Sequence, residues 1–286
     1  MAGRIFVRHK LNIMKSSRYK LIFGAVDAVT STISHSAGAD FIWASSFILS
    51  AMMGKKDDGI TNIKTFSHHI KSISMGSNNI IFDFDIGGKN IRDLGQNLKH
   101  LVNHGVYGVC IEDESYPKVN AMLGNTGRRL LEPHEMAKKI HYIKSKNVMK
   151  IVIARTHSMI INEQLGDLQK RILAYEDAGA DALAIHYTGS DWRKYAETMA
   201  KLNISKPLVI ILSKELSLPP EIDKIKGVEY LVFPNQLYRE MIGRAMLVSK
   251  NNIYDGSFWQ HITTTDHIFN LVDGINKNLL EGKNEV

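Results

Sequence analysis

DAGADALAIHYTG, residues 177–189, joins the end of a helical pattern to the start of an apolar strand. A glycine just beyond a helix adopts the left-handed conformation at little cost, so Gly179 is expected to end the helix and turn the chain into the strand. The same arrangement recurs in SAGADFIWASS (36–46), NHGVYGVCIEDES (103–115) and IKGVEYLVFPNQ (225–236), around Gly38, Gly105 and Gly227. A loose repeat of helix, glycine and strand therefore organises the chain.

The helical half of this repeat is clearest between Asn162 and Ala178. Apolar side chains recur there at three- and four-residue spacing, at Leu165, Leu168, Ile172 and Tyr175. The charged residues fall at other positions and are expected on the surface: Asp167, Lys170 and Arg171.

Eight apolar segments have the pattern of strands, and helical patterns separate most of them. They lie at Leu21, Phe41, Ile80, Val106, Ile151, Ala182, Leu208 and Tyr230. Alternation of strand and helix over about 250 residues predicts an α/β protein with a parallel sheet, and eight units predict a closed (β/α)8 TIM barrel. A doubly wound open sheet is the alternative, but no G-x-G-x-x-G follows an early strand. We expect one domain over residues 1–286, with 257–286 as a C-terminal helical extension.

The composition is that of an ordinary globular protein. In 286 residues there are 36 Lys+Arg and 29 Asp+Glu, a formal charge of +7, with 44% apolar residues and one cysteine. These values exclude a disordered chain and a disulfide scaffold. No apolar run is long enough to span a membrane, and the basic N-terminal stretch lacks the apolar segment of a signal peptide, so a cytoplasmic protein is expected. The positive charges are scattered, which argues against nucleic-acid binding.

Polar side chains gather where the predicted strands end. In chain order these ends carry Trp43, Ser45 and Ser46, then Asp83 and Asp85, then Glu112, Asp113 and Glu114, then Arg155, His186 and Asn235. Active sites of (β/α)8 barrels lie at the carboxyl ends of the strands. We therefore expect these residues to meet at one mouth of the barrel, although solvated loop residues would give part of the same pattern.

Asp83 and Asp85 are separated by one residue, so a strand would place both carboxylates on one face and Phe84 on the other. Two neighbouring carboxylates repel unless a cation or a proton lies between them. Glu112 ends the next strand and adds a third carboxylate. Oxygen ligands of this kind suit Mg2+. The alternative is that these acids cap the following helices or face solvent.

Two groups at the neighbouring strand ends could bind an anion. Arg155 offers a planar fork for a carboxylate or phosphate, and His186 could donate to the same anion or act as an acid or base. Each residue taken alone is equally consistent with an ordinary pairing in the barrel mouth. Trp43 could form a wall of the pocket or simply pack, and Cys110 has the surroundings of a small core residue.

Residues 112–135 form a long connection with two prolines and two glycines. Long ordered loops in compact domains often act as lids over active sites. Four residues in it could close over a charged substrate: Lys118, Asn120, Arg128 and Arg129. A mobile surface loop with incidental charges is the alternative.

The combined motifs resemble those of a known family. They are FIWASSF (41–47), SAMMGKKD (50–57), DFDIGG (83–88), GVCIEDESYPKVNA (108–121), IVIARTHSMI (151–160) and AGADALAIH (178–186). In order and spacing they resemble the phosphoenolpyruvate mutase branch of the isocitrate lyase superfamily, from about Gly24 to Asn235. The resemblance implies a (β/α)8 barrel, Mg2+ at the strand ends, and a homotetramer in which a C-terminal helix is exchanged between subunits.

The resemblance also implies roles for the acidic residues. Asp83 would be the direct Mg2+ ligand, and Asp57, Asp85 and Glu112 would hold the metal through waters. The family interconverts phosphoenolpyruvate and phosphonopyruvate, which moves a phosphoryl group between oxygen and carbon. A metal-stabilised enolate and positioned donors fit that chemistry.

The substrate-binding residues follow from the same resemblance. Backbone amides near Ser46 and Phe47, with the Ser45 side chain, would bind the substrate carboxylate. The phosphoryl group would be handled by Arg155, His186 and Asn120. Lys118 and Asn120 would belong to the gating loop, and Trp43 and Asn235 would complete the substrate site.

The chain departs from the mutase pattern at several positions. Glu114 stands where the mutases have Lys, Ala121 where they have Ser, and Ile86 and Lys89 replace a usual Thr and Gly. A negative charge beside a phosphate site is unfavourable, so Glu114 is expected to point outward or to pair with a cation such as Lys118. Asn120 is retained, and the Cys-containing loop segment of the carbon–carbon lyases is absent. A phosphonopyruvate hydrolase, a 2-oxo acid lyase or decarboxylase, and a non-catalytic basic binding protein remain alternatives.

Overall fold

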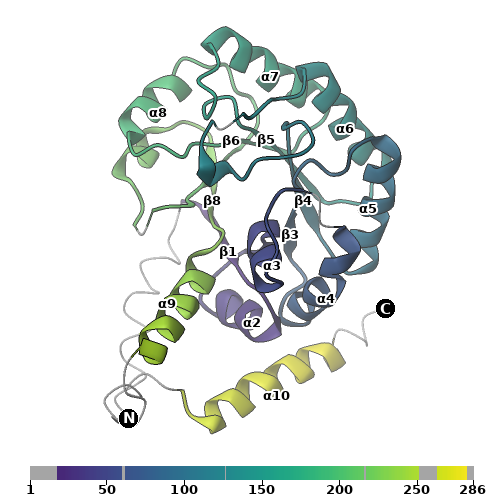
Figure 1. The fold of residues 1–286 in the computed structure, drawn as a ribbon, viewed down its shortest axis with the longest axis vertical. Coiled ribbons are helices and arrows are strands. Elements are labelled where there is room, and N and C mark those ends of the chain that lie inside the picture. Colours follow the sequence, from purple (N-terminus) through teal and green to yellow (C-terminus); the bar gives the residue numbers. More distant parts are fainter. Residues whose placement is uncertain (1–17, 60–61, 126, 216, 251–262, 282–286) are drawn as a thin grey trace.

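In a computed structural model, which describes residues 18–59, 62–125, 127–215, 217–250 and 263–281, eight parallel strands close into a barrel in sequence order (Figure 1). The strands are β1 (Lys20–Gly24), β2 (Phe41–Ala44), β3 (Ile80–Asp83), β4 (Gly108–Glu112), β5 (Ile151–Thr156), β6 (Ala182–Ile185), β7 (Leu208–Ile211) and β8 (Val228–Phe233). Pairing of β1 with β8, with Lys20 opposite Tyr230, completes the closure. The predicted (β/α)8 barrel is confirmed, and the N-terminal basic stretch lies outside the described residues.

Helices α2 to α8 lie on the connections between strands and surround the barrel, and α9 and α10 follow the last strand (Figure 1). They are α2 (Ala28–Ser36), α3 (Ser46–Met52), α4 (Ser67–Gly76), α5 (Ile91–Asn103), α6 (Pro133–Lys146), α7 (Leu165–Asp177), α8 (Trp192–Met199), α9 (Gln236–Lys250) and α10 (Thr265–Glu281). Three short 3-10 helices complete the set: η1 (Ile63–Phe66), η2 (Ala121–Leu123) and η3 (Pro220–Lys224). Between β7 and β8 the described residues contain η3 where a barrel helix would lie.

The four repeated glycines behave as predicted. Gly38, Gly105, Gly179 and Gly227 have φ values of 101°, 78°, 93° and 80°. This left-handed conformation is favourable for glycine and allows each helical segment to turn into the next strand.

Two strand boundaries differ from the prediction. β4 begins at Gly108, not at Val106, because the Val106 amide still donates to Leu101 O at the end of α5. β3 ends at Asp83, because Gly87 N donates to Phe84 O in a turn and Asp85 has a φ of 49°.

The core has two layers, as expected for a filled barrel. The inner layer consists of residues that alternate along the strands: Ile22, Trp43, Ile81, Cys110, Ile153, Ala182, Ala184, Val209, Ile211, Tyr230 and Val232. Residues of the opposite parity, such as Phe82 and Val109, pack outward against the helices. The expectation that Cys110 is a small core residue is confirmed.

Helix α7 contains an exception to the predicted amphipathic pattern. Leu168, Ile172 and Tyr175 are buried, but Leu165 is 39% exposed and Arg171 is only 5% exposed. The prediction that Arg171 lies on the surface is wrong. Its guanidinium is buried because it pairs with Glu163 at 2.8 Å and approaches Asp113 at the end of β4.

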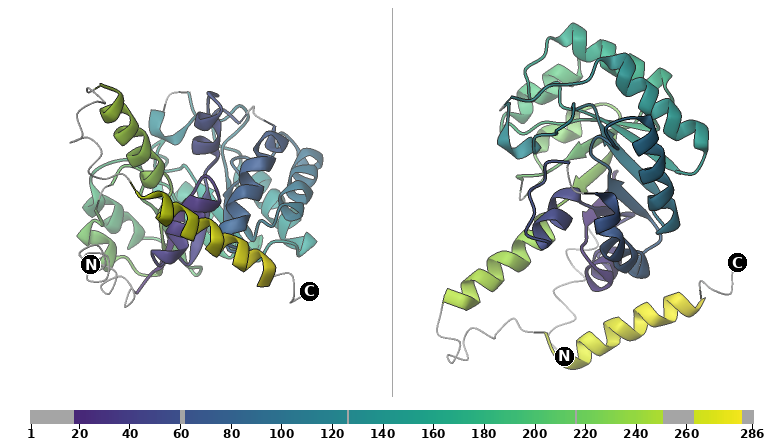
Figure 2. Two further views of the ribbon diagram at one scale, coloured as in Figure 1. Left: turned by 90° about the horizontal axis from the view of Figure 1, so that it is seen from below. Right: turned by 45° about the vertical axis from the view of Figure 1, so that its right-hand side comes forward.

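Helices α9 and α10 extend from one side of the barrel (Figure 2). Helix α10 contacts α2 and α4, and its Ile275 is buried. Other apolar side chains of α10 remain exposed, namely Ile268, Phe269 and Val272. The predicted helical tail is therefore confirmed over 265–281, whereas 257–262 and 282–286 lie outside the described residues. Within the described ranges, no helix has the length and apolar content that a bilayer crossing requires.

Candidate active site

The inward-facing rows of the barrel become polar at the carboxyl ends of the strands. The next inward positions after Ile81, Cys110, Ile153 and Ala184 are Asp83, Glu112, Arg155 and His186. A strand alternates its side chains between two faces, so a residue two positions after an inner core residue also points inward. The local sequence of each strand thus directs a charged or polar group into the same mouth.

These groups line one cavity with an empty volume of about 490 Å³. Eleven of the predicted site residues contribute to its wall: Trp43, Ser45, Phe47, Asp57, Asp83, Glu112, Lys118, Asn120, Arg155, His186 and Asn235. The structure therefore brings together side chains from six strand ends and two loops. The two remaining predicted residues, Ser46 and Asp85, lie just behind this wall, where the Ser46 hydroxyl donates to Asp85 Oδ1 at 2.7 Å.

Two buried cations hold the carboxylates of the cavity. Arg155 Nη2 lies 3.1 Å from Asp83 Oδ1 and also binds Glu112. Lys118 Nζ lies 2.8 Å from Asp57 and 2.5 Å from Asp85. Four carboxylates thus surround two cations in a region nearly closed to solvent.

The pKa values of the carboxyl groups record this crowding. Burial raises the pKa of Asp83, and raises the pKa of Asp85 well above its ordinary value, against the attraction of Arg155 and Lys118 respectively. Burial acts in the same direction on Glu112, but Arg155 and Lys118 outweigh it and the pKa of Glu112 is lowered. The four carboxyl groups of the site thus share only two cations, Arg155 and Lys118.

Asp85 reaches the site by a different route from the one predicted. Strand alternation was expected to place it beside Asp83, but β3 has ended and Asp85 has left-handed backbone geometry. Its carbonyl accepts a hydrogen bond from Glu112 N at 2.8 Å, and its carboxylate meets Lys118. The turn, and not the period of the strand, brings this carboxylate to the group.

Part of the long connection after β4 lines the cavity, through Lys118, Val119, Asn120, Ala121 and Met122. Lys118 is buried, and Asn120 Nδ2 donates to Asp57 Oδ2 at 2.6 Å. The other two cations of the loop do not reach the cavity: Arg128 is buried behind it and Arg129 is exposed. Of the four residues predicted to close over a substrate, Lys118 and Asn120 line the cavity, and Arg128 and Arg129 do not.

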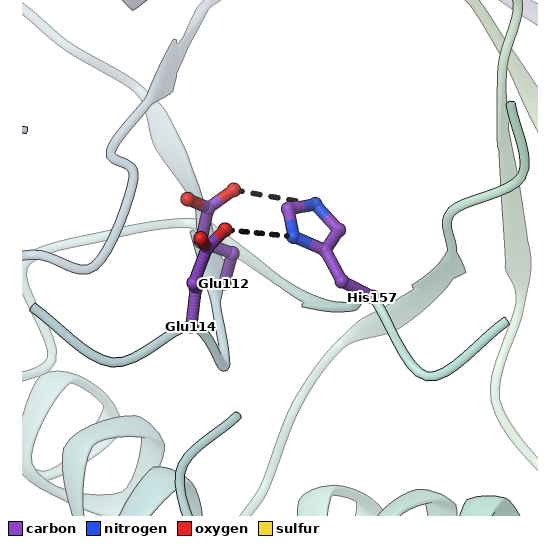
Figure 3. A group of neighbouring side chains, drawn as sticks. All are labelled: Glu112, Glu114 and His157. Carbon is purple, nitrogen blue, oxygen red and sulfur yellow. Dashed lines mark hydrogen bonds and ion pairs between the residues drawn. The ribbon is translucent and has the colours of Figure 1, made fainter. Parts of the chain in front are cut away.

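Glu114 points inward and pairs with Arg128, not with Lys118. Its Oε1 also accepts from the Val119 amide. His157 follows β5 and lies between Glu112 and Glu114, with its Nδ1 3.2 Å from Glu114 and its Nε2 3.5 Å from Glu112 (Figure 3). Burial, with a smaller effect from Glu112, raises the pKa of Glu114 to about 8.

His157 is a residue of the site that the strand pattern did not predict. It lies two positions after Arg155, so the alternation that directs Arg155 inward applies to it as well. The predicted strand ended at Arg155, so its alternation was not extended to His157. The pairing of His157 with the distant Arg128 had no signal in the local sequence.

Unpaired buried atoms mark where a ligand fits. Among the described residues, five cavity-lining side chains have a buried polar atom without a hydrogen-bond partner: Trp43 Nε1, Asp83 Oδ1, Glu112 Oε1, Arg155 Nε and His186 Nε2. Unpaired buried polar atoms are costly and rare in folded proteins. Three are donors or potential donors and two are carboxylate oxygens, so the cavity is built for an anion together with a cation.

Two groups of side chains could hold a metal ion. Asp83 Oδ1 and Glu112 Oε1 accept no hydrogen bond, although Asp83 Oδ1 forms an ion pair with Arg155, and oxygen-only ligation suits Mg2+. Glu112, Glu114 and His157 also offer ligand atoms within 4.8 Å of one another. In this second group Arg128 already supplies a cation, because it binds Glu114 and lies 2.8 Å from His157 Nδ1.

Comparisons with known proteins agree with this geometry. The sequence profile described as phosphoenolpyruvate phosphomutase matches residues 12–251. Phosphoenolpyruvate phosphomutase of Tetrahymena pyriformis is 26% identical over 250 residues, which cover 85% of this chain and 82% of that protein. The crystal structure of phosphoenolpyruvate phosphomutase from Streptomyces platensis subsp. rosaceus superposes with a TM-score of 0.81 at 22% identity, covering 97% of this chain and 98% of that one. A phosphonopyruvate hydrolase in complex with oxalate and Mg2+ superposes with a TM-score of 0.79 at 21% identity, covering 96% and 98%.

Proposed function

Because the chain belongs to the phosphoenolpyruvate phosphomutase family, we propose that it interconverts phosphoenolpyruvate and phosphonopyruvate. The observation that carries the proposal is the set of buried polar atoms without a hydrogen-bond partner in one cavity, where donors lie beside carboxylate oxygens. A substrate with a phosphoryl group, a carboxylate and an enolate oxygen offers partners to both kinds of atom.

The donors are placed to hold the phosphoryl group. Arg155 Nε and His186 Nε2 are unpaired in the cavity, and Lys118 and Asn120 enter from the loop above it. Burial strengthens charge-assisted hydrogen bonds because water does not compete for them. Fixed donors of this kind stabilise a phosphoryl group in transit without reorganising during the reaction.

We propose that the substrate carboxylate binds beside the start of α3. Ser45 caps this helix, with its hydroxyl accepting from Ile48 N, and Ser45 and Phe47 line the cavity. The amides of Ser46 and Phe47 belong to the first turn, which leaves them without intrahelical partners. Trp43 and Asn235 also line the cavity.

Asp83, Asp85, Glu112 and Asp57 are the residues that would hold Mg2+. Four carboxyl groups face two cations there, and a divalent cation would relieve the remaining negative charge. Bound there, Mg2+ would supply stabilisation of the negative charge on the pyruvate enolate oxygen. The oxalate and Mg2+ bound by the similar phosphonopyruvate hydrolase support this assignment.

A phosphonopyruvate hydrolase is the second candidate, because a hydrolase is among the similar structures. The mutase requires exclusion of water from the phosphoryl group, and the hydrolase requires its admission. Asn120 at the cavity wall and the buried Lys118 close the mouth, which favours the mutase. Glu114 and Ala121, which depart from the mutase pattern, are the reason to test the alternative.

Phosphorus NMR of the purified protein with phosphonopyruvate and Mg2+ tests the proposal. We expect the carbon-bound phosphorus signal to be replaced by that of phosphoenolpyruvate, with no free phosphate. Stoichiometric phosphate and pyruvate would assign a hydrolase, and release of pyruvate only from a phosphorus-free 2-oxo acid would assign a lyase. Asn125→Ala, an exposed change in the same loop, serves as the control for Asn120→Ala.

We further propose a homotetramer. The exposed Ile268, Phe269 and Val272 on α10 lie in one stretch of the helix, and α9 adds exposed Met246 and Leu247. Contiguous exposed apolar surface marks association sites, and a second copy of the chain is its proposed occupant. Light scattering after size exclusion measures the assembly, and a monomeric mass at micromolar concentration would contradict it.

A further inference from the structure

The buried side chains behind the cavity form a continuous chain of contacts. Arg128 Nη1 lies 2.8 Å from His157 Nδ1, and His157 Nε2 lies 3.2 Å from His186 Nδ1. His186 Nε2, at the end of this chain, has no partner among the described residues and belongs to the cavity wall. The chain of contacts joins the loop after β4 to a side chain that faces the substrate.

The chemistry of these groups sets the positions of the protons. Arginine has only donors, so the nitrogen that accepts from it must carry a lone pair. His157 Nδ1 is therefore unprotonated, and the proton of the neutral ring lies on Nε2. That proton points to His186 Nδ1 at 3.2 Å, which is nearer than Glu112 Oε2 at 3.5 Å, so His186 Nδ1 accepts and the proton of His186 is left on Nε2.

We propose that Arg128 and His157 are positioning residues that keep His186 in the tautomer with a proton on Nε2. His186 then presents a hydrogen-bond donor to the cavity, which is the form an anionic phosphoryl group requires. The opposite tautomer would present a lone pair and repel the anion. The substrate named in this inference rests on the proposed function. The tautomer of His186 does not depend on it.

Glu114 provides the acceptor for an alternative arrangement of the histidine protons. Its Oε2 binds Arg128 and lies 3.2 Å from His157 Nδ1. Without Arg128, His157 would donate from Nδ1 to Glu114, and its Nε2 would accept from His186 Nδ1. Both rings would then reverse their tautomers, so Arg128 decides which of two complete hydrogen-bond chains forms.

The loop holds Arg128 in place. Its Nη2 donates to Asn120 O at 3.1 Å and to Gly124 O at 3.3 Å. The residue that sets the proton of His186 is thus bound to the same loop segment that brings Asn120 to the cavity. Closure of the loop and placement of the proton are coupled through one guanidinium.

Nitrogen-15 NMR of the full-length wild-type protein, labelled at histidine and measured near pH 7.5, tests the proposal directly. Protonated and unprotonated nitrogens of a neutral imidazole give well-separated signals, and His157→Gln and His186→Asn variants assign them. We expect both rings to be protonated on Nε2 and unprotonated on Nδ1. A proton on Nδ1 of His186, or a doubly protonated His157, would overturn the proposal.

Arg128→Met is the matching perturbation, and Arg193→Met on the surface of α8 is the control. We expect Arg128→Met to reverse both tautomers and to lower kcat for phosphonopyruvate conversion about 100-fold, the range of one positioned donor, with a smaller change in KM. Arg128→Lys retains a donor and should restore the Nε2 proton and part of kcat. Unchanged tautomers in Arg128→Met would refute the role of Arg128.

A double variant tests the proposal in case Arg128→Met alone fails to fold. Glu114→Gln with Arg128→Met removes both buried charges together, so neither is left without its partner. We expect His186 in this variant to show signals of both tautomers, and a single wild-type tautomer with wild-type kcat would contradict the proposal. Wild-type protein with the expected tautomers but no turnover would refute the proposed function and leave the positioning role standing.

Discussion

Arg171→Met tests the residue whose position the sequence pattern misplaced. Arg171 leaves α7 and reaches the end of β4, where its Nη1 donates to Leu131 O at 2.7 Å and lies 3.4 Å from Asp113 Oδ2. Asp113 is completely buried, and burial raises its pKa against the opposing attraction of Arg171. Removal of the guanidinium therefore leaves a buried carboxyl group without its cation.

The magnitude follows from what Asp113 retains. Loss of one partner of a buried ion pair costs about 3–5 kcal/mol. Asp113 keeps the Tyr175 hydroxyl at 2.7 Å and the His157 amide at 3.1 Å, and Glu163 at the edge can be solvated. We therefore expect the lower end of the range, about 3 kcal/mol of unfolding free energy, or a fall in Tm of about 6–10 °C.

Thermal and urea unfolding of the wild type and four variants provide the assay: Arg171→Met, Lys170→Met, Asp113→Asn and the double variant of Asp113 and Arg171. Lys170→Met, at the exposed neighbouring position, should change stability by less than about 0.5 kcal/mol. Asp113→Asn combined with Arg171→Met should lose less than the sum of the single changes, since neither charge is then left alone. A loss below about 1 kcal/mol for Arg171→Met, or additivity in the double variant, would refute the interpretation of Arg171 as a buried anchor.

Three further outcomes are expected. Asp83→Asn should weaken Mg2+ binding measured by calorimetry at least about 100-fold, because one unit charge at about 4 Å is worth about 4 kcal/mol at an effective dielectric constant of 20; affinity within threefold of wild type would remove Asp83 from the metal site. Asn120→Ala breaks the bond to Asp57 and should lower kcat about 100-fold with a much smaller effect on Mg2+ affinity, whereas equal losses would show a purely structural role. Burial acts to raise the pKa of Glu163, but hydrogen bonds, led by those from Arg171, lower it below its ordinary value of 4.5. The pair of Glu163 and Arg171 therefore stabilises the fold above that pH. This contribution is lost as the pH falls through the pKa of Glu163 in the folded protein. Glu163→Gln should therefore lower stability near pH 7 by about 1–3 kcal/mol and converge with wild type in acid; a constant difference at every pH would contradict the pairing.

Glu114 shows how a departure from the family pattern is accommodated. A carboxylate beside a phosphate site was expected to point outward or to pair with a cation such as Lys118. In the structure the carboxylate lies inside and Arg128 neutralises it. The extra negative charge therefore does not face the cavity as an unpaired group, and Lys118 remains bound to Asp57 and Asp85.

The fold was predictable because its determinants are local. A glycine at the end of four of the helical patterns and the apolar strand that follows it specify a repeated unit, and eight alternating strands leave a closed parallel barrel as the favourable way to pair every strand. Alternation along a strand also predicts that Asp83, Glu112, Arg155 and His186 face the same interior, since each inward row depends only on residue parity. The carboxyl ends of parallel strands then meet without further information.

The connections among these side chains depended on the tertiary structure. Arg128 and His157 are 29 residues apart, and their contact depends on the path of a long loop over the barrel. Arg171 has the local pattern of a surface residue. It is buried only because its guanidinium pairs with Asp113 and Glu163. A helical period reports which residues share a face, but not what another segment presents to that face. Buried charges take their partners from distant segments, so their pairing is decided only when the chain has folded.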